Sequence, residues 1–107
     1  MSHFSPSETT REFVRQVGRN LRLARKRRRK TIEEVAGMVG VSAATIKRVE
    51  AGESAVKFGI YLAIAEVFQL TDTIRFAEPG SDAIGMTMEK QRMPQRIRKK
   101  KDSRLDF

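Results

Sequence analysis

Apolar side chains recur every three or four residues through the first two thirds of the chain, which is the spacing of helices that bury one face. The first predicted helix begins near Ser7 or Thr10, either of which can cap it. It frays through residues 27–30, where like charges crowd together. Its apolar stripe is made of Val14, Val17, Leu21 and Ala24.

Two short helices follow, and each has a capping residue in front of it and a glycine behind it. Thr31, with Glu34 three residues later, has the form of a capping box, and Gly40 stops this second helix. Ser42 caps a third helix over residues 43–51, which ends at Gly52. A fourth helix is predicted from about Lys57 to Phe68. The inward positions of these helices are Ile32, Val35, Ala36, Val39, Ile46, Val49, Tyr61, Ile64, Ala65 and Phe68.

Residues 73–77 alternate polar and apolar side chains and end at a Glu-Pro-Gly turn, a pattern that favours a short strand. A lone strand in a helical chain leaves backbone groups unpaired unless a second copy pairs with it. The segment is therefore a candidate dimer seam, and an unpaired linker is the alternative. The candidate strand residues are Thr73, Ile74, Arg75 and Phe76.

The predicted fold is all-α, a compact bundle of four to five helices, with this short C-terminal strand pairing across a dimer and a basic flexible tail. The domains expected are a flexible N-terminus over residues 1–10, a helical domain over 11–72, an extension for dimerisation or partner binding over 73–93, and a disordered basic tail over 94–107.

The formal net charge of +9 is concentrated in two segments. Residues 11–30 contain ten of the 22 Lys and Arg residues, and residues 89–107 contain eight, whereas the segment between them is acidic. Such clustering is typical of proteins that bind a polyanion, most often nucleic acid, and a merely solubilising surface is the alternative. A membrane surface fits less well, because residues 98–101 have no aromatic or long aliphatic face to insert.

Composition disfavours several other functions. The chain has no Cys and a single His, His3, which argues against disulfides, metal clusters and most His-based acid–base chemistry. No nucleophile or phosphate-binding glycine loop accompanies its carboxylates, so no enzyme activity and no cofactor are predicted. With no apolar run near the roughly 20 residues that span a bilayer and no signal-peptide pattern, a cytoplasmic protein is expected.

The stretch from Ile32 to Glu50 has the spacing of two short helices packed at a steep angle. Ala36 is small where the helices must approach, and Gly40 suits a turn with positive φ. Ile46 fills the gap between them. Two such helices joined by a turn of three to four residues form a helix-turn-helix, whose second helix fits a major groove about 12 Å wide.

Residues 17–70 resemble the Cro/phage-repressor helix-turn-helix family, also called the XRE family, which has a lambda-repressor-like fold. The runs that carry the resemblance are Val17-Gly18, Leu21-Arg22, Ala24-Arg25, Thr31 to Ala36, Gly40-Val41-Ser42, Thr45 to Gly52 and Leu62 to Ala65. Ile32 departs from the pattern, since the family usually has there a Gln that bonds the DNA backbone.

This resemblance implies roles for individual residues. Ala43, Ala44, Lys47 and Arg48 match positions that face bases, and Arg48 can bond guanine in bidentate fashion. Arg25 and Glu50 match a structural ion pair between the first and third helices. Because Ile32 stands where the family has Gln, contact with the DNA backbone is expected to shift to Arg22, Lys26 and Lys57. The full set of residues expected at DNA phosphates is Arg22, Lys26, Thr31, Ser42, Thr45 and Lys57.

The resemblance implies a sequence-specific transcriptional repressor that binds a palindromic site in double-stranded DNA as a homodimer. The C-terminal third is similar to HipB-like antitoxins, which implies an autoregulating antitoxin that neutralises a HipA-like kinase toxin. The alternatives are a stand-alone repressor of the XRE type and a bridging transcriptional coactivator.

Overall fold

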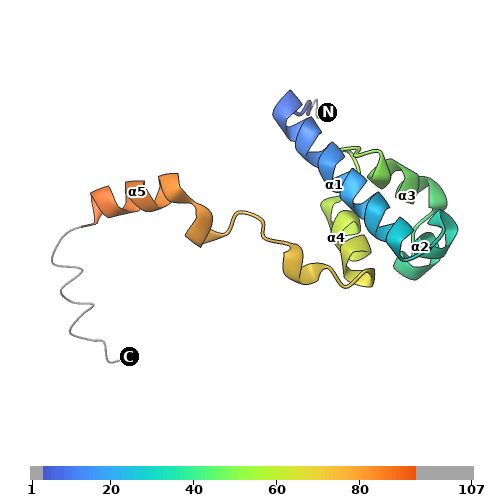
Figure 1. Ribbon diagram of the computed structural model, residues 1–107. Coiled ribbons are helices and arrows are strands. Elements are labelled where there is room, and N and C mark those ends of the chain that lie inside the picture. Colours follow the sequence, from blue (N-terminus) through green and yellow to red (C-terminus); the bar gives the residue numbers. More distant parts are fainter. Residues whose placement is uncertain (1–3, 94–107) are drawn as a thin grey trace. The chain divides into compact units, whose positions relative to one another are not determined.

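The computed structural model describes residues 4–93 of the chain, and every regular element in that range is helical (Figure 1). The chain divides into two compact units, residues 1–74 and 75–107. Among the described residues, the first unit holds four α-helices and one 3-10 turn, and the second holds a further 3-10 turn and one α-helix. Their bounds are α1 (Glu8–Arg27), α2 (Ile32–Val39), α3 (Ala43–Glu50), α4 (Phe58–Val67), η1 (Thr71–Thr73), η2 (Pro79–Ser81) and α5 (Ala83–Arg92).

The helices begin at side-chain caps that the sequence marks. The Ser7 hydroxyl accepts a hydrogen bond from the Thr10 amide at 3.2 Å, so α1 starts at Glu8 and takes in residues 8–10, which were expected to be flexible. Thr31 and Glu34 form the predicted capping box of α2. Gly40 ends that helix with φ of +88°, in the left-handed region where a side chain is disfavoured.

One apolar core holds the first unit together. α1 to α4 each contribute to it, and Val35, Ile46 and Val49 are almost completely inaccessible to solvent. α3 packs against both α1 and α2, while α4 packs against α2. The predicted helix-turn-helix, made of α2, the turn at Gly40 and α3, is therefore confirmed as part of a compact helical body. The full core is Leu21, Ala24, Val35, Ala36, Ile46, Val49, Tyr61, Ile64, Ala65 and Phe68.

The prediction of a strand over residues 73–77 was wrong. Its candidate dimer residues were Thr73, Ile74, Arg75 and Phe76. Thr71–Thr73 form the 3-10 turn η1, and no strand occurs anywhere within residues 4–93. The backbone forms local hydrogen bonds here: the amides of Thr73 and Ile74 donate to the carbonyls of Leu70 and Thr71, respectively. Alternation over five residues is too short a signal to outweigh this local turn.

The second unit contains one helix that the sequence pattern did not predict. In α5, the Asp82 carboxylate caps the helix by accepting from the Gly85 amide at 2.9 Å. None of its residues is buried, and Ile84 and Met88 are 76% and 52% exposed. The basic tail predicted over residues 94–107 lies outside the described residues. No helix within residues 4–93 combines the length and the apolar character needed to cross a membrane.

Candidate nucleic-acid interface

α3 is an eight-residue helix with one face in the core and the other in solvent. Ile46 and Val49 point inward, at 1% and 0% exposure. Ala44, Lys47 and Arg48 are exposed, and Lys47 and Arg48 lie three and four residues after Ala44, so they share the outer face with it. Three of the four predicted base-facing residues thus form one accessible stripe. Ala43, the fourth, is half-buried and packs partly against the core.

The first turn of α3 presents polar groups to solvent. The Ser42 hydroxyl accepts from the Thr45 amide at 3.1 Å, and the two hydroxyl oxygens lie 3.0 Å apart. The first amides of a helix have no intrahelical acceptor, and together with the helix dipole they favour an anion at this end. Ser42 and Thr45, both predicted to meet phosphate, therefore lie together at a helix end suited to it.

A nearly buried ion pair fixes the far end of α3 to α1. The Arg25 guanidinium donates from Nε to Glu50 Oε2 at 2.7 Å and from NH2 to Glu50 Oε1 at 3.0 Å, and the side chains are only 10% and 9% exposed. The hydrogen bonds to Glu50 raise the pKa of Arg25 above its ordinary value, so the guanidinium stays charged. Arg25 also donates to the carbonyl of Lys30 at 2.9 Å. One side chain thereby joins α1, the α1–α2 turn and α3.

A close backbone contact reinforces this junction. Gly18 is buried in the middle of α1, where a Cβ atom would lie 2.4 Å from the Val49 carbonyl oxygen and 2.9 Å from the Gly52 amide nitrogen. Backbone atoms cannot swing away as a flexible side chain can. The absence of a side chain at position 18 therefore lets α1 touch the end of α3 directly.

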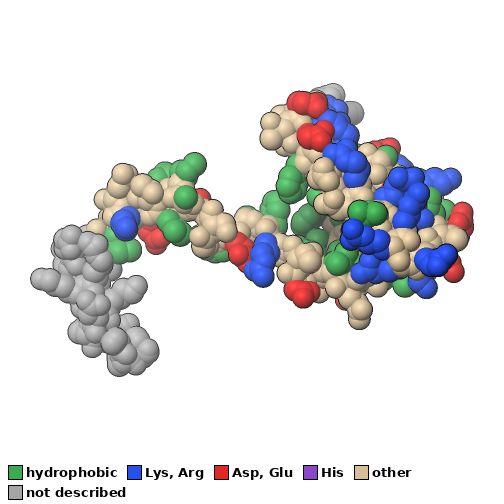
Figure 2. Space-filling model, in the orientation of Figure 1, with side chains coloured by type: hydrophobic (Ala, Val, Ile, Leu, Met, Phe, Trp, Pro, Cys, Tyr) green, Lys and Arg blue, Asp and Glu red, His purple; other side chains and the backbone are tan. Residues whose placement is uncertain are grey.

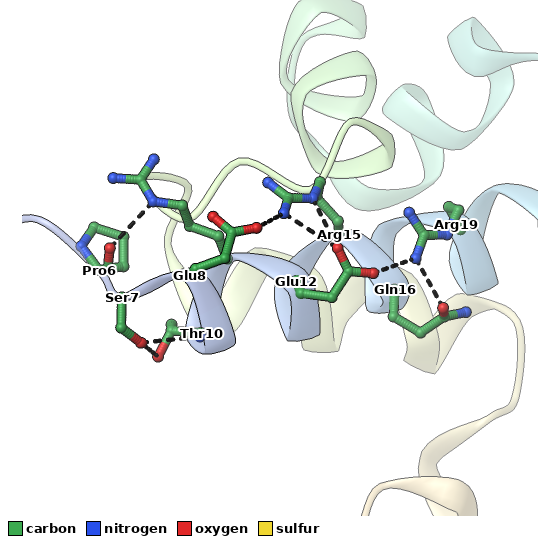
Figure 3. Close-up of polar contacts among 9 residues, drawn as sticks. Pro6, Ser7, Glu8, Thr10, Glu12, Arg15, Gln16 and Arg19 are labelled. Carbon is green, nitrogen blue, oxygen red and sulfur yellow. Dashed lines mark hydrogen bonds and ion pairs between the residues drawn. The ribbon is translucent and has the colours of Figure 1, made fainter.

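Carboxylates of α1 neutralise two of its arginines, Arg15 and Arg19, whereas Arg11 donates to the Pro6 carbonyl (Figure 3). Arg15 pairs with Glu8 at 2.6 Å and with Glu12 at 3.1 Å, and Arg19 pairs with Glu12 at 2.9 Å. Hydrogen bonds from Arg19 and Arg15 lower the pKa of Glu12, so its charge is present at neutral pH. These two arginines are engaged within their own helix and contribute little net field.

The second half of α1 and the turn after it carry cations without such partners. Figure 2 shows Lys and Arg side chains gathered over this part of the molecule. Arg22 approaches Glu50 only to 4.0 Å and is 55% exposed. Within residues 4–93, the side chains of Lys26, Arg27 and Arg29 form neither an ion pair nor a hydrogen bond. Lys57, just before α4, is also exposed and makes no capping bond.

The first turn of α2 is already occupied by a carboxylate of this chain. Glu34 Oε1 accepts from the Thr31 amide at 2.8 Å, and the Thr31 hydroxyl accepts from the Glu34 amide at 3.0 Å. The Thr31 amide lowers the pKa of Glu34, which keeps this carboxylate ionised. Ile32 packs against the core. The hydroxyl hydrogen of Thr31 and the first backbone amides of α2, which have no intrahelical acceptor, remain for the phosphate contact predicted there.

Sequence reasoning did not find a role for Arg28. Its guanidinium donates to the carbonyls of Ala24 and Phe68, both at 2.9 Å, and lies 5.1 Å from the centre of the Phe68 ring. Arg28 thus joins the ends of α1 and α4, which are 40 residues apart along the chain. Within a run of like charges, no local signal separates this inward arginine from its outward neighbours.

Among the residues that the structure describes, no group of three or more His, Cys, Asp or Glu side chains could hold a metal ion. The accessible chemistry of this surface consists of cations, hydroxyl groups, small methyl groups and a helix N-terminus. Those groups suit recognition of an anionic polymer.

A family model described as a helix-turn-helix domain matches residues 16–75, more than half of the chain. The match begins within α1 and runs through α4 to just past the end of the first compact unit. No curated protein and no solved structure matches the chain.

Proposed function

The chain belongs to the helix-turn-helix domain family, and from that premise we propose that it is a sequence-specific transcriptional repressor that binds a palindromic site in double-stranded DNA as a homodimer. α3 enters the major groove, and the two-fold axis of the dimer coincides with that of the site. The proposal assigns no catalytic step to the protein.

The observation that carries the proposal is the outer face of α3. An α-helix with its side chains is about 10–12 Å across, and the major groove, about 12 Å wide, admits it. Its inner residues are held in the core and its far end is fixed by Arg25, so its outer side chains have a defined direction. A rigid helix that presents a methyl group and two long cations can read base edges.

Two of these side chains have distinct expected roles. The planar guanidinium of Arg48 can donate two parallel hydrogen bonds to O6 and N7 of one guanine. The ammonium of Lys47 acts as a point charge and suits either a base edge or a phosphate. The methyl group of Ala44 can contact the methyl group of a thymine.

The experiment that tests this function is selection from a pool of random duplexes with the purified protein, followed by sequencing. A palindromic consensus with half-sites about one helical turn apart is expected. A pool that stays unenriched after repeated rounds contradicts sequence-specific binding. A consensus without two-fold symmetry contradicts the proposed dimer.

Replacing Arg48 with alanine is expected to weaken binding to the selected duplex by about 1–3 kcal/mol and to relax the preference at one position of each half-site. Titration of the selected duplex and of the same duplex changed at that base pair measures both effects. Arg19→Ala is the matched control, because it removes the same type of side chain from α1, where Arg19 is held by Glu12. If Arg48→Ala retains full discrimination, Arg48 does not read a base.

A role as an antitoxin is the second candidate, with DNA binding as its autoregulation. It is supported by α5, where Ile84 and Met88 are exposed apolar side chains on one face of a helix. Co-expression with a kinase-like product of the same operon is expected to relieve the growth arrest caused by the kinase. Ile84→Asp with Met88→Asp is expected to abolish that relief while DNA binding persists. A double variant that still protects the cell contradicts the role of α5.

A further inference from the structure

The turn that joins α1 to α2 places an arginine at the left-handed position of a helix C-cap, where the Arg29 amide donates to the Lys26 carbonyl and the Lys30 amide donates to the Arg25 carbonyl. Arg29 has φ of +55°, in the left-handed region that favours glycine. The two turns on either side of α3 use glycines for such angles, Gly40 at +88° and Gly52 at +75°. At position 29 the chain instead carries an arginine with a disfavoured backbone conformation.

The charges around Arg29 increase this cost. Arg27, Arg29 and Lys30 follow closely along the chain, and like charges at such spacing repel one another. Nothing within residues 4–93 compensates Arg27 or Arg29 by an ion pair or hydrogen bond, whereas Arg25 and Arg28 of the same run are directed inward. The uncompensated charge at the turn therefore has no structural partner in the part of the chain described.

The position of the turn relative to α3 is fixed. The carbonyl of Lys30 accepts from Arg25, and the same guanidinium holds Glu50 at the end of α3. In a helix-turn-helix bound to DNA, the first helix of the motif crosses the phosphate backbone while the second enters the groove. The turn leads directly into that first helix, α2. A duplex seated on α3 therefore brings its backbone close to the turn.

The first turn of α2 cannot supply the cations for this backbone. Glu33 and Glu34 lie there, and Glu34 is ionised and bonded to the Thr31 amide. The Ile32 side chain offers no hydrogen-bond donor and packs against the core. The segment just before α2 carries exposed cations, Arg27 and Arg29, that can supply positive charge for a phosphate at this edge.

We propose that Arg27 and Arg29 form a phosphodiester-binding segment that holds the DNA backbone at the edge of the recognition site, in a manner independent of base sequence. This inference rests on the proposed DNA-binding function and adds two residues to the interface. The long side chains project from a fixed turn, and each neutralises a phosphate of the same duplex that α3 reads.

The test is a salt titration of the full chain with its selected duplex, comparing the unaltered protein with Arg29→Gly. Arg29→Gly removes one phosphate contact from each subunit. Each lost contact is expected to weaken binding about 15-fold at 50 mM salt and about 4-fold at 200 mM salt. The slope of log affinity against log salt is expected to fall by about one per subunit, with base preference unchanged. The melting temperature of Arg29→Gly is expected to rise by a few degrees, because the strained residue is relieved.

Two further variants separate charge from backbone geometry. Gln69, after α4, has φ of +59°, so Gln69→Gly relieves the same kind of strain and is expected to raise the melting temperature without any effect on binding. Arg29→Gln removes the charge but keeps a side chain at that angle, and it is expected to weaken binding as Arg29→Gly does. Unchanged affinity and salt slope in both Arg29 variants overturn the inference.

The outcomes also distinguish this inference from the proposed function. If the unaltered protein binds no duplex, the function itself fails. If it binds and the Arg29 variants bind equally well, the function stands and the segment does not contact phosphate. A melting temperature that falls in Arg29→Gly, with binding intact, assigns the arginine to stabilising the end of α1 and likewise overturns the proposal.

Discussion

Replacing Glu50 with alanine is expected to lower the free energy of unfolding by about 3 kcal/mol, because it leaves the Arg25 guanidinium nearly buried without its counter-charge. Arg25 would keep its bond to the Lys30 carbonyl but lose both bonds to α3. For a unit of this size, such a loss corresponds to a fall in melting temperature of roughly 15 °C. Denaturant unfolding followed by circular dichroism measures the change.

A matched control separates burial from the mere loss of an ion pair. Glu12→Ala also removes a carboxylate that pairs with arginine, in this case Arg15 and Arg19, but on an exposed helix face. Solvent already screens those pairs, so stability is expected to stay nearly unchanged. The same loss in both variants contradicts the argument from burial.

A double variant that removes both Arg25 and Glu50 tests whether the unpaired buried charge causes the loss of stability. Arg25→Met combined with Glu50→Leu leaves no unpaired charge and fills the same space with apolar atoms, so it is expected to recover most of the stability. A double variant as unstable as Glu50→Ala would show that the geometry of the pair, and not the stranded charge, holds α3 in place.

Local sequence signals predicted the first compact unit well because its helices are defined by caps and periodicity. Ser7, Thr31 and Ser42 cap helices through bonds to amides three residues later, and such bonds depend only on nearby residues. Gly40 marks a turn for the same local reason. The predicted boundaries of α2, α3 and α4 agree with the structure to within about two residues.

The misjudged segments have weaker local signals. The alternation over residues 73–77 suggested a strand, but strand formation depends on a pairing partner that sequence does not specify. α5 was missed because Gly85, Thr87 and scattered methionines give it little amphipathic pattern, and its Asp82 cap was overlooked.

Charge was predicted segment by segment, but the partners of individual cations were predicted only in part. The sequence places ten cations in residues 11–30, and only for Arg25 did the resemblance name a carboxylate partner, Glu50. In the structure, Arg15 and Arg19 pair with carboxylates on their own helix, and Arg25 and Arg28 bond groups on α3 and α4. The surface available to an anion is therefore a subset centred on the second half of α1, which only three-dimensional contacts identify.

Replacing Gly18 with alanine is expected to destabilise the first unit by about 2 kcal/mol, although alanine is the better helix former. In an exposed helix interior the change would stabilise by roughly 1 kcal/mol. At position 18 the added methyl group would lie 2.4 Å from the Val49 carbonyl oxygen, so α1 and α3 must separate. Denaturant unfolding measures the free energy, and affinity for the selected duplex measures the displacement of α3.

Gly37→Ala is the matched control, because Gly37 lies inside α2 and a methyl group added there would have nothing within 4 Å. It is expected to raise stability by about 0.5–1 kcal/mol, through helix propensity alone. If Gly18→Ala lowers the free energy of unfolding and Gly37→Ala raises it, the loss at position 18 is due to the contact with α3. If both variants are stabilised, α1 can shift to admit the methyl group, and the placement of α3 depends on the ion pair with Arg25 rather than on close backbone packing.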